Sequence, residues 1–249
     1  MSLFSQLSTP KAPGLPTAPK PAVPMALPKI RVPTAAGICK SYQPSAQGQA
    51  LLQPSQTPAQ YMSALEQKNL STDQINLLSH GMPERESVHW ACQSSRKVDG
   101  QLPPADKNAL GAAEAWVKNP CDATKSQAAT AASQTDYHGP GAWAAQGAAW
   151  SQSPGGTAPA TGPTGDAVAG SVNIAAAMAA KPAVPAVPAA PALPTAPTLA
   201  APKLAAPPAP TLAPPVLEVP PNVLEQQAKV HQPFIDLGKD VASGKNTWA

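Results

Sequence analysis

Proline is the feature that most restricts what this chain can fold into. The sequence contains 34 prolines in 249 residues, and they are dense in the stretches 1–36 and 181–221. Each proline fixes φ, removes a backbone N–H donor and disfavours helix at the preceding residue. Between residues 182 and 197 a proline falls at every third position, which matches the repeat of a polyproline II helix. We therefore predict extended arms at these two stretches and a folded part between them.

The remaining composition favours one modest domain. Hydrophobic residues make up 43% of the chain, but alanine supplies much of this fraction and only 4% of residues are aromatic. A domain of roughly 100–140 residues is expected, with a core built on few large side chains. The net charge is +3 and 12% of residues are charged, so nothing general in the electrostatics favours nucleic-acid binding. We predict no nucleic-acid partner.

Helix start signals recur through the middle of the sequence. Thr57 precedes Pro58 and is followed at the third position by Gln60, which predicts an N-cap, a first-turn proline and a capping box. Further predicted helices begin with a proline that is followed by an acidic residue in the first turn. Apolar residues then recur along them at helical spacing. The predicted fold is all-α, a small domain of about six to eight short helices with long Pro/Ala-rich arms. The predicted division is a Pro-rich N-terminal arm at 1–45, a helical domain at 46–180, a Pro/Ala-rich spacer at 181–221 and a C-terminal amphipathic helix at 222–249.

Tryptophans are the largest side chains available to this domain. Trp116 lies on the apolar stripe of one predicted helix, and Trp143 and Trp150 are seven residues apart on another. Trp90 lies on the helix that begins after Pro83. We predict that all four tryptophans form the core rather than a ligand-binding box.

The last predicted helix has a regular apolar stripe. Val230, Phe234, Leu237 and Val241 fall at positions i, i+4, i+7 and i+11, and Pro233 should kink or split the helix. Such a stripe must be buried, either against the helical domain or against a partner. The four residues are therefore a protein-binding hypothesis, and the sequence leaves both alternatives open.

Metal, disulfide and targeting signals are weak in this sequence. The cysteines, Cys39, Cys92 and Cys121, are far apart and form no CxxC pair or His/Cys cluster, so neither a zinc site nor a disulfide framework is indicated. No basic and apolar leader opens the chain, and no apolar run is long enough for a membrane helix. We predict no cofactor, no membrane insertion and a cytoplasmic location, with any export dependent on a dedicated apparatus.

A reaction centre is hard to assemble from these residues. Glu86, His89 and Cys92 lie one helical turn apart and are the nearest approach to an acid/base and nucleophile set. A histidine beside an aromatic is more often structural, and Cys92 lacks nearby basic residues that would lower its pKa. We predict no catalytic, cofactor-binding or metal-ligating residue, and keep these three residues as the basis of an alternative.

One distinctive run is Pro83-Glu84-Arg85-Glu86, which leads to Trp90 and Cys92. Together with several other segments, it resembles an uncharacterised family of bacterial helical proteins that are often encoded among type VI secretion genes. This run is the most specific part of the resemblance. The chain departs from the family at His89, where relatives tend to have a second aromatic, and in the length of its proline spacer. The similar segments are 49–52, 57–65, 77–92, 112–117, 142–145, 150–151, 167–170 and 234–244.

The resemblance implies a function that composition alone does not give. It implies a non-enzymatic adaptor or accessory protein of a type VI secretion system, which binds spike (VgrG-like), baseplate or effector proteins through its helical domain and arms. The family has no established active site, so no catalytic residue is implied. The alternatives are a secreted effector or enzyme that uses Glu86, His89 and Cys92, and a passive envelope spacer.

Overall fold

The computed structural model describes residues 26–180 and 221–245, and in these ranges the fold is all-α. This confirms the predicted fold class. Of the ten α-helices in these described ranges, the first two have four and six residues and the other eight are longer. The α-helices are α1 (Ala35–Ile38), α2 (Ala46–Leu51), α3 (Pro58–Gln67), α4 (Ser71–Gly81), α5 (Glu84–Arg96), α6 (Pro104–Lys118), α7 (Asp122–Ser133), α8 (Pro140–Trp150), α9 (Pro163–Ala180) and α10 (Pro221–Ala242). Short 3₁₀ turns, η1 (Asp99–Gln101) and η2 (Pro154–Gly156), lie in two of the connections.

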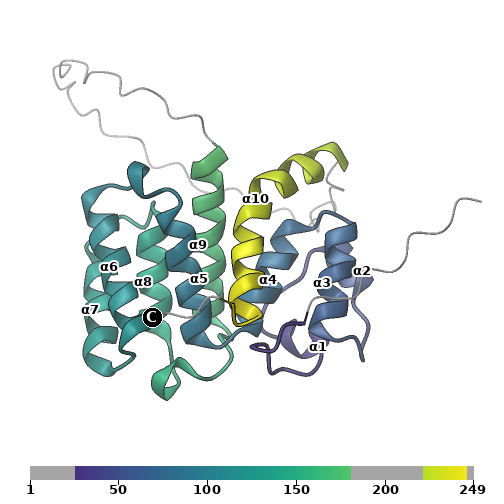
Figure 1. The fold of residues 1–249 in the computed structure, drawn as a ribbon, viewed down its shortest axis with the longest axis horizontal. Helices are drawn as coiled ribbons and strands as arrows, with labels where there is room; N and C mark the ends of the chain where they lie inside the picture. Colours follow the sequence, from purple (N-terminus) through teal and green to yellow (C-terminus); the bar gives the residue numbers. More distant parts are fainter. Residues whose placement is uncertain (1–25, 181–220, 246–249) are drawn as a thin grey trace, which may run out of the picture.

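Helix α5 lies at the centre of this arrangement. It packs against α6, α8, α9 and α10, and it follows α4 directly in the chain. Helices α6 to α9 form one side of the molecule, α1 to α4 form the other, and α10 lies between α9 and α4 (Figure 1). The central position of α5 means that its side chains can contact most of the domain.

The core differs in composition between the two sides. Around α3, α4, α5 and α10 it contains large fully buried side chains, whereas around α7, α8 and α9 it contains mostly alanine. The small alanine side chains let neighbouring helices approach closely, although each buries little apolar area. The large side chains on the first side include Tyr61, Leu65, Ile75, Leu77, Leu78, Trp90 and Ile235.

The folded part begins earlier than the sequence indicates. Residues 26–45 belong to the predicted N-terminal arm, yet Ile30, Ala35 and Ile38 are buried in the core. The prolines in this segment are compatible with folding because it is mostly non-helical. Ile30 and Ile38 pack against Gly81 of α4, and the Lys29 amide donates to the Ala242 carbonyl of α10 at 3.0 Å. Residues 1–25 of the predicted arm and residues 181–220 of the predicted spacer lie outside the described residues.

Helix α10 packs on its own domain, which answers the question that the sequence left open. Phe234 and Val241 are buried in the common core, and Val230 and Leu237 pack partly buried against it. A Cβ on Gly238 would lie only 2.7 Å from the Trp90 ring, so this position requires glycine for close approach. The helix contains Pro233 without being divided, and it bends along its length (Figure 1).

The four predicted core tryptophans have different environments. Trp90 and Trp116 are buried, as predicted. Trp143 is half-buried; its indole N–H donates to the Tyr137 carbonyl at 2.9 Å. Trp150 is 40% exposed, so its assignment to the core is wrong. Trp150 is the last residue of α8.

Membrane insertion was not expected from the sequence. None of the helices in residues 26–180 and 221–245 combines the length and the hydropathy that a membrane span requires.

Candidate functional site

The junction between α4 and α5 is tied to a distant loop by backbone pairing. The amide of Glu84 donates to the Ala158 carbonyl at 2.8 Å, and the amide of Ala160 donates to the Met82 carbonyl at 2.8 Å. These bonds form an antiparallel bridge between Pro83 and Pro159. The start of α5 is thereby held against the connection between α8 and α9.

The Glu84 side chain strengthens the same connection. Its carboxylate is buried and accepts hydrogen bonds from the amides of Gln152 and Ser153 at 2.8 and 3.1 Å, and from the Ser153 hydroxyl at 2.6 Å. These three donors satisfy the buried carboxylate. In return, the carboxylate gives the two amides and the hydroxyl an acceptor inside the protein. Glu84 is therefore a structural residue.

The next two residues of α5 bind two further segments. The Arg85 guanidinium donates to the Val117 carbonyl at 2.7 Å and to the Lys118 carbonyl at 3.2 Å, at the C-terminal end of α6 where free carbonyls and the helix dipole favour a cation. Glu86 pairs with Lys29 at 3.1 Å. Each charge in this part of the helix thus contacts a different region of the fold.

The remaining polar side chains on this face also point inward. The Ser87 hydroxyl donates to the Ser79 carbonyl at 2.8 Å, and the Trp90 indole N–H donates to the Phe234 carbonyl of α10 at 2.8 Å. We call Glu84, Glu86, Ser87 and Trp90 the buried face of α5. The most distinctive run of the sequence, 82–92, is therefore used to hold the fold together.

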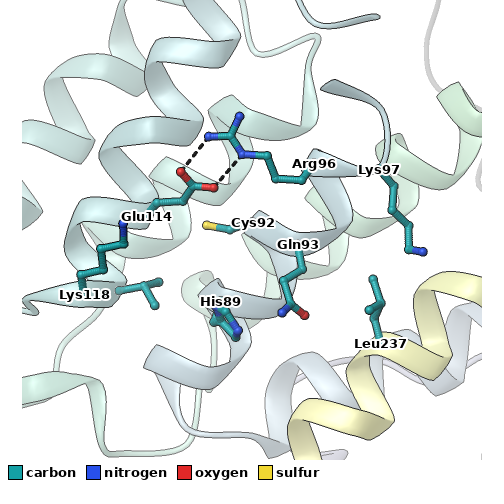
Figure 2. A pocket seen from close by; sticks show the side chains of 9 residues that line it. His89, Cys92, Gln93, Arg96, Lys97, Glu114, Lys118 and Leu237 are labelled. Carbon is teal, nitrogen blue, oxygen red and sulfur yellow. Dashed lines mark hydrogen bonds and ion pairs between the residues drawn. The ribbon is translucent and has the colours of Figure 1, made fainter. Parts of the chain in front are cut away.

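The outer side of α5 borders a hollow of about 580 Å³. Helix α6 forms one wall and α10 contributes Leu237 on the other, with His89 and Cys92 on the α5 floor between them (Figure 2). The lining residues are His89, Cys92, Gln93, Arg96, Lys97, Glu114, Val117, Lys118 and Leu237. This is the candidate functional site, and we call it the α5 groove.

An ion pair closes one end of the α5 groove. Arg96 binds both carboxylate oxygens of Glu114 at 2.7 Å, and it also donates to Asp99 at 2.8 Å (Figure 2 shows the bidentate pair). The hydrogen bond to Glu114 is the main cause that raises the pKa of the Arg96 guanidinium above its ordinary value. Bidentate geometry fixes the position of both side chains.

The three residues of the enzyme hypothesis are only partly brought together. His89 and Cys92 both line the α5 groove, whereas Glu86 does not and pairs with Lys29 instead. Burial raises the pKa of the Cys92 thiol far above its ordinary value, and burial lowers the pKa of His89. A thiol of raised pKa stays protonated near neutral pH and is a weak nucleophile. This geometry gives the enzyme hypothesis no support.

A metal site was not indicated by the sequence. Among the residues that the structure describes, no three His, Cys, Asp or Glu side chains gather closely enough to hold a metal ion.

Sequence reasoning missed the groove and one structural carboxylate. Arg96, Glu114 and Lys118 come from two helices, and no spacing within either helix indicates that they meet. Asp106 is buried and accepts from the amides of Gly141 and Ala142 at 3.0 and 2.7 Å, which caps the start of α8. The sequence does contain a signal for the Asp106 contact, because a helix that begins with Gly-Pro-Gly has no capping side chain of its own.

Comparison with known protein families gives one match. Residues 61–200 match the sequence profile of a family of unknown function (DUF6931). The chain belongs to this family. The expectation of an uncharacterised family is thus confirmed. The matched range contains most of α3 and all of α4 to α9, whereas α10 lies beyond it. Searches of curated proteins and of solved structures gave no match.

The family range and the structural domain have different limits. Trp90 lies inside the match, whereas its partner Phe234 lies outside it, and the same holds for Glu86 and Lys29. The matched helices are thus completed by segments from both flanks of the chain.

Proposed function

We propose that this member of the DUF6931 family is a non-catalytic adaptor or accessory protein of a bacterial type VI secretion system. Its partners are spike (VgrG-like), baseplate or effector proteins. The helical domain binds one partner, and the Pro/Ala-rich segments extend the surface that partners can reach. The secretion context rests on the resemblance of the run 82–92 and its neighbours to proteins encoded among type VI secretion genes.

The placement of α9 and α10 carries the adaptor proposal. Helix α9 ends at Ala180 and α10 begins at Pro221, and both pack in the same domain. A hollow of about 450 Å³ is lined by Ala180 together with Val230 and Pro233, so the end of α9 lies beside α10. The chain therefore leaves the domain at Ala180 and re-enters the same domain at Pro221. A segment held at both ends stays at high local concentration beside any partner bound to that domain.

The use of polar groups supports the same proposal. The charged residues of the most distinctive run hold separate segments of the fold, and the α5 groove contains an ion pair rather than an activated nucleophile. A rigid domain with an open groove suits protein binding more than chemistry. Phe234 and Val241 could meet a partner only if α10 left the domain, so the proposal does not use these two residues of the apolar stripe.

Crosslinking and affinity purification of the full chain from its native cell tests this proposal. Spike, baseplate or effector peptides crosslinked to the domain or to residues 181–220 are expected, and they should disappear in a host that lacks the spike and effector genes. An unrelated set of partners that persists in that host would overturn the proposal.

A variant in which residues 182–220 are replaced by a Gly/Ser segment of equal length tests the role of the Pro/Ala-rich segment. Partner recovery should fall, while the thermal unfolding of the domain should stay the same. The matched control replaces residues 1–25 in the same way. Unchanged recovery in both variants would assign binding to the helical domain alone.

A further inference from the structure

The outer side of α5 forms one narrow open stripe. Apart from Arg85, the residues of α5 that are not buried are His89, Gln93 and Arg96, and the exposed Lys97 follows them as the C-cap of the helix. Their spacing of three and four residues places them on one side of the helix. The other residues of α5 are buried, so α5 has a single side on which another molecule can bind.

The two neighbouring helices turn this stripe into a groove. Helices α6 and α10 both pack on α5, and side chains from each of them line the same hollow. The floor and walls include apolar groups from Cys92, Val117 and Leu237, while charged groups lie around them (Figure 2). A hollow between helices, with an apolar floor and a polar rim, suits a helical or extended segment that inserts one apolar side chain.

The charges around the α5 groove are predominantly positive. Arg96, Lys97 and Lys118 contribute cations, and Glu114 is the acid among the lining residues. Both oxygens of Glu114 are occupied by Arg96. Lys97 lies 6.0 Å from the centre of the Phe234 ring, and neither it nor Lys118 has an acidic partner among the described residues. The groove therefore offers two ammonium groups to an incoming carboxylate.

We propose that the α5 groove binds a segment of a partner protein in which acidic residues flank an apolar side chain. The apolar side chain contacts Cys92, Val117 and Leu237, and the flanking carboxylates pair with Lys97 and Lys118. The proposal rests on the proposed function, since it specifies the surface and the partner chemistry for a protein-binding domain. Because the ammonium groups are exposed, binding should weaken as salt increases.

The test selects peptides on the purified full chain from a phage-displayed library of random sequences of about 14 residues, enough for roughly four helical turns. The expected result is enrichment of peptides in which Asp or Glu flanks Leu, Ile, Phe or Trp. The selected peptides should bind the Lys97→Glu/Lys118→Glu variant at least about tenfold more weakly than the original chain. Enrichment of peptides without acidic residues, or no enrichment, would overturn the proposal.

A matched control separates local from general electrostatics. Lys40→Glu/Lys68→Glu makes the same change in net charge at exposed residues that do not line the groove. This variant should bind the selected peptides within about twofold of the original chain. Equal weakening in both variants would show that net charge, and not the groove, attracts the peptides, and would contradict the proposal.

The failure of this proposal is distinguishable from the failure of the proposed function. If the Lys97→Glu/Lys118→Glu variant still recovers spike, baseplate or effector proteins from cells as well as the original chain does, the groove proposal is wrong and the adaptor function stands. If the original chain recovers no secretion component but binds acidic peptides through the groove, the secretion context is wrong and the groove proposal stands.

Discussion

The two sides of α5 use their polar residues in opposite ways. On the buried face, Glu84, Glu86 and Trp90 each bind a different distant segment. On the open stripe, Gln93 and Lys97 line a groove, and no ion pair within residues 26–180 and 221–245 holds Lys97. The same helix thus separates residues that maintain the fold from residues that another molecule can reach. The charged residues at the start of the most distinctive run can therefore be structural, while the groove combines His89 and Cys92 from the end of that run with residues of other segments.

The largest expected effect compares two tryptophans. Trp90→Ala should lower the free energy of unfolding by about 3–5 kcal/mol, because it opens a cavity and leaves the Phe234 carbonyl without its donor. Trp150→Ala should cost less than about 1 kcal/mol, since that ring is 40% exposed. Urea unfolding followed by circular dichroism measures both values. Equal costs would contradict the assignment of Trp90 to the buried face and Trp150 to the surface.

A smaller effect is expected at the first carboxylate of the buried face. Glu84→Gln keeps the shape of the side chain but replaces an acceptor with a donor beside the amides of Gln152 and Ser153. The free energy of unfolding should fall by about 1–3 kcal/mol. Asp236→Asn is the control, because Asp236 is exposed on α10, and its cost should stay within about 0.5 kcal/mol. Thermal and urea unfolding of the two variants test the difference.

Local features of the fold could be predicted from the sequence. The capping box at Thr57 forms with Gln60 because both partners lie within one turn, so the pattern itself contains the geometry. The amphipathic stripe of α10 indicates correctly that its apolar side must be buried. The sequence could not say where, because the contact of Phe234 with Trp90 joins residues that are far apart in the chain.

Other features depend on tertiary context and could not be predicted. Trp143 and Trp150 have the spacing of one helical face, but α8 is apolar on nearly all sides, so its periodicity does not distinguish inside from outside. The α5 groove joins Lys97 and Lys118 from separate helices. Only the packing of α5 against α6 places these residues around one space.

The stability of the fold should also depend on pH. Burial lowers the pKa of His80, His89 and His231, so the folded chain favours their neutral forms. Below the ordinary histidine pKa of about 6.5, the unfolded chain binds more protons than the folded chain. The free energy of unfolding should therefore decrease as pH falls from about 7 to 5.

Urea unfolding across this pH range measures the effect. His89→Gln/His231→Gln should show a shallower decrease than the original chain, because two of the titrating groups are gone. A free energy of unfolding that does not change between these pH values would contradict the lowered pKa values of the histidines in the folded chain.

The smallest effect on stability is expected at the two exposed lysines of the α5 groove. Lys97→Gln/Lys118→Gln should change the free energy of unfolding by less than about 1 kcal/mol, because both side chains reach solvent and have no acidic partner among the residues that the structure describes. Differential scanning calorimetry checks this value. A cost as large as that of Glu84→Gln would mean that the groove lysines also hold the fold.

The most direct test of the buried face is native-state hydrogen exchange on the full chain. Because Trp90 joins α10 to α5, we claim that the two helices open as one cooperative unit. The amides of Ile235, Gly238 and Val241 should therefore exchange with the same free energy of opening as those in the middle of α5. If the α10 amides exchanged through a separate opening of much lower free energy, α10 would be a loosely attached helix, and the claim would be wrong.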